Sequence, residues 1–343
     1  MKASQKIVLA SVLFSSACVL ADPPGLDRGP SVFPHATSNE GVFVEAHPEK
    51  YQHVYAMSDA HGMHQNLIKL LKSAHVIDQN QKWSAGKSLL LVLGDSIDKG
   101  PETIEVIQFW MDLQPQAEAA GGKLVHLLGN HEAEFLANPL NDKKAIAFYD
   151  ELNAKKLDRD TYTDDQFAQA RFLHEMPVAA HVGNWLFAHS GYIDHKQFKT
   201  LNEFSNAAAN LLMQQNYSDD LFIGKQSILE AKKWWAQDSS KRDKMETFMD
   251  HNGIFGLVFG HQPKALNVEG ADAISQDQRL IKVDNGMAPE AGSHPGSVLM
   301  FINPVEMNRM APATVFSIHS GAEGLMPLQT EQSMSTADDS TND

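Results

Sequence analysis

Five apolar segments of this chain each end in a short polar cluster that contains glycine. The clusters are Asp59-Ala60-His61-Gly62, Gly94-Asp95-Ser96-Ile97-Asp98-Lys99-Gly100, Gly129-Asn130-His131-Glu132, Ala188-His189-Ser190-Gly191 and Gly260-His261-Gln262-Pro263. A single Asp-Gly or His-Gly pair after a strand is usually only a turn. The ordered set is more informative, because the carboxyl ends of strands in an α/β sheet face one crevice, where all five clusters can meet.

The side chains in these clusters are suited to metal binding. Carboxylate and imidazole groups without thiolate favour first-row divalent metals such as Mn, Fe or Zn. Six ligand-type side chains are more than one ion needs, so two ions that share a carboxylate are expected. Glycine beside each cluster lets the loop turn tightly and lets the backbone approach the ions.

Strands and helices are predicted to alternate along the first half of the chain. The apolar segments 53–59, 88–94 and 124–129 are predicted strands, and residues 66–73 and about 101–113 are predicted helices. This alternation indicates an α/β domain. The remaining expected elements are a charged helical cap inserted over 142–176, a hairpin over 178–190, helices around 197–215 and 226–238, and strands at 254–260, 279–283, 297–302 and 314–318.

Both termini differ in composition from the central part of the chain. Lys2 and Lys6 precede an apolar run that ends at Ala21, which predicts a signal peptide over residues 1–21 and a periplasmic or secreted protein. Residues 22–50 are expected to form an N-terminal arm and residues 51–327 the folded domain. Residues 328–343 have almost no apolar content and are expected to form a disordered tail.

Charge and cysteine usage exclude several classes of function. The formal net charge of −15 argues against a nucleic-acid partner, because phosphate contacts need clustered Lys and Arg. It also disfavours binding to an anionic membrane surface after leader removal. The single cysteine, Cys18, lies in the predicted leader, so the mature chain has no thiol for nucleophilic catalysis.

Read in order, the clusters resemble a known family. Asp-x-His, Gly-Asp-x-x-Asp-Lys-Gly, Gly-Asn-His-Glu and two later histidines resemble the calcineurin-like metallophosphoesterases over roughly residues 53–303. The leader and the stretch Val283-Asp284-Asn285-Gly286-Met287 are similar to the Shewanella-like protein phosphatases within that superfamily. The resemblance implies a four-layer αββα fold, in which two mixed β-sheets lie face to face, helices cover them, and the metals bind at one edge.

The resemblance also implies a role for each matching side chain. The implied ligands of two Zn, Fe, Mn or Mg ions are Asp59 and His61 for the first ion, Asp95 as the bridge, and Asn130, His189 and His261 for the second. His131 would be the general acid that protonates the leaving oxygen, oriented by Asp98. A water activated by the ions would attack phosphorus in line with the leaving group, in one step.

Three positions bear on how substrate is bound. Lys99 stands where the protein phosphatases usually carry arginine, and lysine lacks the bidentate fork of a guanidinium group. Arg171, in the predicted insertion, is the candidate for a second phosphate-binding cation, although a surface ion pair is the simpler interpretation. Pro263 follows His261 where some diesterases have another histidine, which leaves three protein ligands for the first ion and favours a monoesterase.

Three functions remain open on the sequence alone. The first is a phosphatase of phosphoproteins, with phosphotyrosine suggested by the resemblance and an aromatic slot expected from Phe135, Tyr149, Tyr162 and Phe172. The second is a phosphatase of nucleotides, dinucleotide polyphosphates or other small phosphoesters. The third is a metal-binding or solute-binding protein without catalysis, which the pairing of His131 with Asp98 disfavours.

Overall fold

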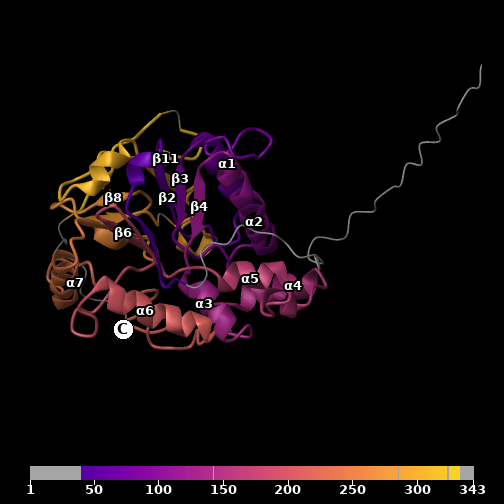
Figure 1. Ribbon diagram of the computed structural model, residues 1–343. Coiled ribbons are helices and arrows are strands. Elements are labelled where there is room, and N and C mark those ends of the chain that lie inside the picture. The colour runs from indigo at the N-terminus through magenta and orange to yellow at the C-terminus, as the bar shows by residue number, and fades with distance from the viewer. Residues whose placement is uncertain (1–39, 142, 285, 323, 333–343) are drawn as a thin grey trace, which may run out of the picture.

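Two mixed β-sheets form the centre of the molecule, as the computed structural model shows (Figure 1). The structure describes residues 40–332 except 142, 285 and 323; the predicted leader, most of the arm and the end of the tail lie outside these residues. The five-stranded sheet has the order β11 (Val315–His319), β10 (Ser297–Phe301), β2 (Val54–Met57), β3 (Leu89–Val92) and β4 (Lys123–His126).

The seven-stranded sheet contains the first and the last of the described strands. Its order is β1 (Val42–Glu45), β5 (Ala179–Val182), β6 (Trp185–Ala188), β7 (Gly256–Phe259), β9 (Leu280–Lys282), β8 (Ala273–Ile274) and β12 (Gln329–Thr330). β2, β3 and β4 are parallel neighbours in one sheet, and β6, β7 and β9 are parallel neighbours in the other. Parallel neighbours end at the same edge, which is what the predicted convergence of strand-end clusters requires.

Alternate residues of the strands face two different apolar layers. Val54 and Ala56 of β2 pack in the layer between the sheets, whereas Tyr55 and Met57 pack under the helices outside. Both faces of the strand are therefore buried, which explains its continuous apolar sequence. Phe187 of β6 reaches the same inter-sheet layer from the opposite side.

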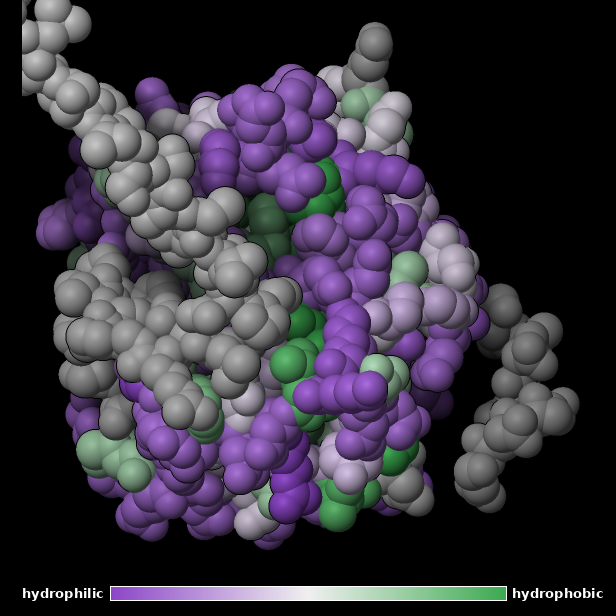
Figure 2. All heavy atoms as spheres, turned by 90° about the vertical axis from the view of Figure 1, so that its right-hand side faces the viewer, coloured by the Kyte–Doolittle hydropathy of each residue, from purple (hydrophilic) through white to green (hydrophobic). Residues whose placement is uncertain are grey.

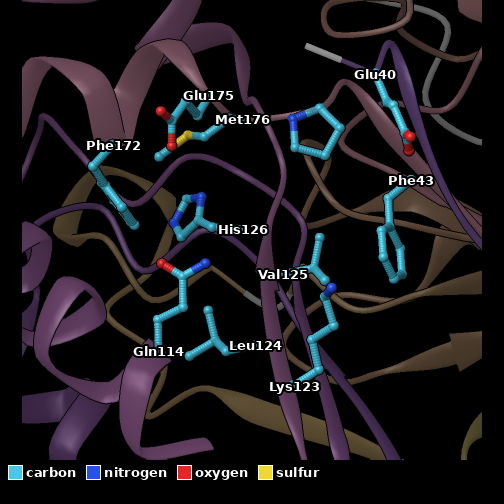
Figure 3. Close-up of a pocket in the computed structure, with 11 residues that line it drawn as sticks. Glu40, Phe43, Gln114, Lys123, Leu124, Val125, His126, Phe172, Glu175 and Met176 are labelled. Carbon is cyan, nitrogen blue, oxygen red and sulfur yellow. The ribbon is translucent and has the colours of Figure 1, made fainter. Parts of the chain in front are cut away.

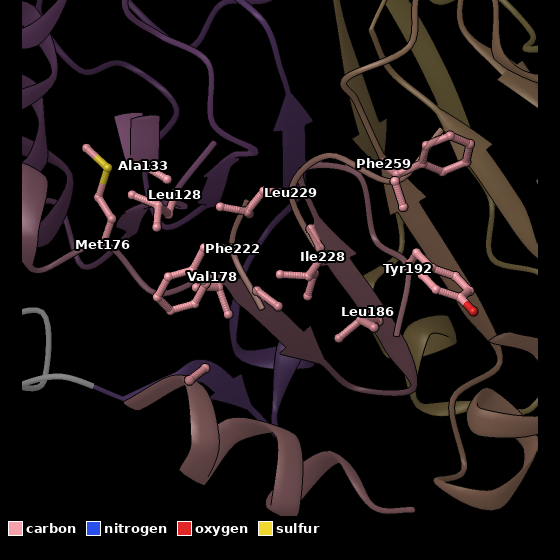
Figure 4. Close-up of a cluster of buried hydrophobic side chains, with 14 of the residues drawn as sticks. Leu128, Ala133, Met176, Val178, Leu186, Tyr192, Phe222, Ile228, Leu229 and Phe259 are labelled. Atoms are coloured by element: carbon pink, nitrogen blue, oxygen red, sulfur yellow. The ribbon is translucent and has the colours of Figure 1, made fainter. Parts of the chain in front are cut away.

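Helices cover the outer faces of both sheets. They are α1 (His64–Ser73), α2 (Thr103–Ala119), α3 (Asn130–Ala137), α4 (Ile146–Ala154), α5 (Ala168–His174), α6 (Leu201–Met213) and α7 (Ser240–His251). α1 and α2 contribute Leu70 and Trp110 to the layer outside the five-stranded sheet. α6 and α7 contribute Phe204 and Phe248 to the layer on the other side, part of which Figure 4 shows. The predicted α/β class and the two mixed sheets with flanking helices are confirmed.

Three segments differ from the sequence prediction. Within the predicted arm, β1 is a regular strand that pairs in parallel with β5. Within the predicted tail, β12 pairs with β8. Both are short edge strands whose partners are distant in sequence, so local composition gives little sign of them.

The predicted helix at 226–238 is irregular, and the helix of this region is instead α7. Tertiary contacts outweigh helix propensity here: Trp234 Nε1 donates to the carbonyl of Ser190 at 3.0 Å, and Ser190 and Gly191 donate their N–H groups to the Ile228 carbonyl. α7 begins after Ser239, whose side chain caps it, in a stretch too charged to show an apolar periodicity.

One face of the molecule is largely polar. The face in Figure 2 is dominated by hydrophilic residues, with hydrophobic residues in small separate spots among the described atoms. Among the residues that the structure describes, every helix is too short or too polar to span a bilayer.

Candidate metal centre

The five strand-end clusters converge. Two groups of side chains offer ligand atoms within 4.8 Å of one another: His61, Asp95 and His131 form one group, and Asp95, His189 and His261 form the other. They come from the ends of β2, β3, β6 and β7 and from the start of α3 after β4. Asp95 belongs to both groups, which gives the centre two halves joined by one carboxylate.

The first half lies at the ends of β2 and β3. His61 Nε2 is 3.6 Å from Asp59 Oδ1 and 3.6 Å from Asp95 Oδ2. The other ring nitrogen, Nδ1, lies 3.2 Å from the carbonyl oxygen of Ile97, which turns Nε2 toward the carboxylates. A histidine held this way presents a fixed lone pair to a cation.

The second half is built around the amide of Asn130. Its Oδ1 lies 3.2 Å from Asp95 Oδ2, 2.9 Å from His261 Nδ1 and 3.0 Å from His189 Nε2. The oxygen thus faces a carboxylate oxygen and two imidazole nitrogens, all of which can act as acceptors. Such a set of buried lone pairs is unfavourable unless a cation or protons lie among them, so the donor set fits a metal ion.

The electrostatics of the second half point the same way. Burial disfavours the charged form of His189, but the carboxylates of Asp95 and Asp59 outweigh burial and raise its pKa to about 9. The negative potential of the centre therefore retains positive charge even on a fully buried imidazole, which is what a cation site requires.

The ligand loops adopt a backbone conformation that is unusual for side chains other than glycine. Asp59, His61, Asp95 and His261 have positive φ values of 59°, 44°, 52° and 65°. Each such residue costs on the order of 1 kcal/mol or more unless its surroundings hold it. Hydrogen bonds between the loops do so: His61 N donates to Asp95 O at 2.8 Å, and His261 N donates to Asp59 Oδ2 at 3.0 Å.

Glu132 ties the loop after β3 to the start of α3, a role that sequence reasoning missed. Its buried carboxylate accepts N–H groups of Gly129, Asp95, Ser96 and Ile97 at 2.7–3.2 Å. Burial, with a further contribution from Asp95, raises the pKa of Glu132 to about 7. The capping pattern of glutamate three residues after Gly129 was the available sequence signal.

The same contact requires glycine at position 129. A Cβ at that position would lie 2.2 Å from the Asp95 nitrogen. The loop after β3 and the start of α3 therefore approach too closely for any side chain there.

His131 and Asp98 form the pair that the resemblance implied. His131 Nδ1 lies 3.0 Å from Asp98 Oδ2, and Nε2 lies 3.9 Å from Asp95 Oδ2. Asp98 Oδ1 also accepts the N–H of Phe148 at 3.0 Å. Burial lowers the pKa of His131, although Asp95 and Asp98 oppose that change. The ring is thus fixed by Asp98, with its second nitrogen facing the centre.

The two predicted substrate-binding cations lie in different places. Lys99 Nζ is 3.0 Å from His61 Nε2, so Lys99 is at the centre. Arg171 Nη1 donates instead to the carbonyl oxygen of Asp165 at 2.7 Å, within its own segment. A cation that the structure does bring to the second half is Lys144, which sequence reasoning did not single out.

The insertion over 142–176 is part of the core and does not form the expected aromatic slot. Phe148 contacts Phe135 and Tyr162, with ring centroids 4.7 and 5.2 Å apart, and all three are buried. Phe172 lines a cavity of about 40 Å³ with His126 at the edge of β4 (Figure 3). Only Tyr149 of the four aromatic residues proposed for the slot is neither fully buried nor in that cavity.

Glu151 shows how firmly the insertion is attached. Its carboxylate accepts the N–H groups of Thr103 and Ile104 at 2.8 and 3.3 Å, which caps α2. Together with the Phe148 bond to Asp98, this makes the insertion a support of the site, so it is not a removable cap.

Comparison with known proteins places the chain in a family. A family model described as "Calcineurin-like phosphoesterase" matches residues 53–275. The chain is 31% identical over 99 residues to "Shewanella-like protein phosphatase 2" of Arabidopsis thaliana, covering 29% of this chain and 25% of that protein. It is 31% identical over 100 residues to "Bis(5'-nucleosyl)-tetraphosphatase, symmetrical" of Nitrosococcus oceani, covering 27% of this chain and 31% of that protein.

A solved structure shares the fold. The cold-active protein-tyrosine phosphatase of a psychrophilic Shewanella species superposes with a TM-score of 0.65 at 21% identity, over 83% of this chain and 82% of that chain. The curated relatives match over smaller parts: the chain spans about a quarter to a third of the length of these two proteins.

Proposed function

We propose, because this chain belongs to the calcineurin-like phosphoesterase family, that it is a dinuclear metal-dependent phosphomonoesterase acting on phosphoproteins, with phosphotyrosine as the favoured residue. The observation that carries the proposal is a pair of candidate ligand groups joined by Asp95, the first of which contains His131, whose ring Asp98 orients. A metal-binding or solute-binding protein would have no need of a buried histidine oriented in this way.

The contacts within the centre support a proposed set of ligands. The first ion would be held by Asp59 and His61, the second by Asn130, His189 and His261, and both by Asp95. Imidazole, carboxylate and amide ligands suit Zn, Fe, Mn or Mg. When bound, two such ions supply Lewis-acid activation of a water and neutralise charge on the phosphate.

His131 and Lys99 have proposed roles toward the substrate. His131 would deliver a proton from Nε2 to the leaving oxygen, while Asp98 holds the ring by its Nδ1 edge. Lys99 lies beside His61 and would bind a phosphate oxygen as a point charge. Arg171, the other sequence candidate, donates instead to the carbonyl oxygen of Asp165.

A second candidate function has its own support. Similarity to the symmetrical bis(5'-nucleosyl)-tetraphosphatase favours hydrolysis of dinucleotide polyphosphates or other small phosphoesters. Superposition on a protein-tyrosine phosphatase establishes the shared fold and not the substrate. Our preference for phosphoproteins rests on the likeness to the Shewanella-like phosphatase. Pro263, two residues after His261 where some diesterases have another histidine, favours a monoesterase.

The predicted signal peptide indicates where the proposed enzyme would act. A signal peptide over residues 1–21 would deliver the enzyme to the periplasm or outside the cell, so its protein substrates would be met there.

One set of assays tests the proposed function. The chain from residue 22 would be purified and its metals measured by elemental analysis. Turnover of phosphotyrosine peptide, phosphoserine peptide, ATP and diadenosine tetraphosphate would then be compared. We expect two metal ions per chain and the highest kcat/KM on the phosphotyrosine peptide. Turnover of the nucleotides alone would establish the alternative, and a single ion per chain would contradict the dinuclear site.

A further inference from the structure

We propose that Lys144, at the start of the insertion, binds the phosphate group of the substrate on the second-ion side of the centre. This inference rests on the proposed function and adds a substrate-binding residue that the sequence motifs do not contain. Lys144 lies two residues before α4, and its carbonyl oxygen accepts from His131 Nδ1 at 3.0 Å. The residue is therefore fixed against the proposed general acid by its own backbone.

The side chain of Lys144 reaches a proposed metal ligand. Its Nζ lies 2.9 Å from the terminal amide of Asn130, at the amide atom opposite the one that faces Asp95. Two carboxylates form ion pairs with the ammonium group of Lys144: Glu230 is in direct contact, and Glu134 Oε1 is 3.8 Å away. The side chain is 26% exposed, so solvent and ligands reach it.

The orientation of the Asn130 amide favours the binding of an anion beside Asn130 Nδ2 and Lys144 Nζ. When Oδ1 faces the metal ligands, the Nδ2 group faces Lys144, so two N–H donors meet without an acceptor between them. A phosphate oxygen beside both groups would accept from each of them. Turning the amide over would let Oδ1 accept from Lys144, but the metal site would then lose that oxygen.

Three arginines of the described chain are committed to partners away from the centre. Arg242 is bound by Glu246, Asp277 and Glu331, and Arg279 by Asp250 and the Phe255 carbonyl. Arg171 is bound by the carbonyl of Asp165.

The cations that lie at the centre are lysines and not arginines. Lys99 lies at His61, on the first-ion side, and Lys144 lies at Asn130, on the second. Two lysines thus lie on opposite halves of the centre. An arginine would instead contact two phosphate oxygens from one side with its planar guanidinium group.

Glu230 positions the lysine, and Glu134 adds a longer ion pair. An ammonium group has three N–H bonds: Glu230 accepts one of them, whereas Glu134 Oε1, at 3.8 Å, is beyond hydrogen-bond distance, so two donors remain. Glu134 also accepts from Asn141 at 2.6 Å, so it is itself held in place. Because the lysine is already ordered, binding phosphate costs little additional side-chain entropy.

The test compares neighbouring lysines in the metal-loaded chain from residue 22. The variants are Lys144→Met, Lys144→Arg and, as the matched control, Lys143→Met, which changes the exposed residue next in the chain. The Kd of inorganic phosphate would be measured by calorimetry, together with metal content, KM and kcat.

The expected result is specific to position 144. Loss of one charged hydrogen bond weakens phosphate binding by about 10-fold or more, so Kd and KM should both rise in Lys144→Met. Lys144→Arg should restore binding to within about threefold, since it keeps the charge. Lys143→Met should match the unchanged protein, and all variants should keep their metals.

Three outcomes would overturn the inference. Equal phosphate Kd values for Lys144→Met and Lys143→Met in an active enzyme would refute the role of Lys144 and leave the proposed function intact. Loss of metal in Lys144→Met would show that the residue only assembles the centre. An unchanged chain that is loaded with metal, binds no phosphate and hydrolyses no ester would refute the proposed function itself, and this inference with it.

Discussion

The loops that follow the strands and the insertion that follows α3 reach the same centre by different means. Asp95, at the end of β3, has a 2% exposed side chain, and its main chain donates to Glu132. Lys144, at the start of the insertion, is 26% exposed and is held by the side chains of Glu230 and Glu134. The side proposed to hold the ions is therefore fixed by the main chain, and the side proposed to bind the substrate is held by long side chains.

This difference separates what the fold fixes from what it leaves adjustable. A loop held by main-chain hydrogen bonds keeps its geometry when nearby side chains change, whereas an ion pair between long side chains is easily rearranged. We expect changes on the ion side to abolish metal binding or stability, and changes on the substrate side to alter affinity.

The largest effect is expected at the residue shared by both halves. Asp95→Asn removes the charge while keeping the shape, so both ions should bind weakly and turnover should fall by about a thousandfold or more. Elemental analysis and kcat would be measured together. A variant that retains two ions and full activity would show that Asp95 does not bridge them.

The next effect separates ion binding from proton transfer. His131→Ala should retain its metals but lose about 10²–10⁴-fold in turnover, because it lacks the proposed proton donor. The loss should be smallest for substrates with good leaving groups, such as nitrophenyl phosphate. An equal loss for good and poor leaving groups would argue against the general-acid role.

Two glutamates of α3 provide a matched test of main-chain support. Glu132→Ala leaves four buried N–H groups without their acceptor and should cost about 3 kcal/mol or more in the free energy of unfolding. Glu134→Ala, two residues further on and facing Lys144, should cost about 1 kcal/mol or less. Denaturant unfolding measures the free energy of unfolding of both variants. Equal losses would show that the two regions do not differ in main-chain support.

The last expected effect is a loss of folding stability at low pH, caused by His126 next to the loop after β3. Burial lowers the pKa of His126 to about 3, and its Nε2 lies 2.7 Å from Ser96 Oγ. The unfolded chain takes up a proton at this histidine near pH 6.5 and the folded chain does not until about pH 3. Stability should therefore fall as the pH drops through this window, by about 2 kcal/mol at pH 5.

Unfolding at pH 7 and pH 5 would measure this sensitivity. His126→Gln should lose about 2 kcal/mol less between the two values than the unchanged chain. His75→Gln, at an exposed position, should behave as the unchanged chain does. A His126→Gln variant with the same acid loss would place the titrating group elsewhere.

The two regions also differ in how well the sequence predicts them. The convergence of the candidate ligands Asp59, Asp95 and His189 was predictable because each follows closely on an apolar strand and parallel strands bring their ends together. Lys144 was not, because its contact with Asn130 depends on how the insertion folds back and not on any local pattern. Arg171 had the right charge in the right segment, but its partner is Asp165.

The fold was predicted to a similar degree. Every strand that is buried on both faces shows an apolar run, whereas β1 and β12 pair at sheet edges with few local signs. The segment 226–238 has helix-forming residues, but Trp234 and Ile228 are drawn into contacts with Ser190. Helix propensity gives way wherever burial of a large side chain contributes more free energy.

Positive φ at Asp59, His61, Asp95 and His261 places two opposing demands on each of these positions. The main chain would be relaxed by glycine or asparagine, while the chemistry needs carboxylate or imidazole. A replacement that eases the main chain should therefore yield a more heat-resistant but inactive protein, so activity and robustness are traded against each other at these positions. Substitutions that raise the thermal stability of an active enzyme would have to occur at other residues.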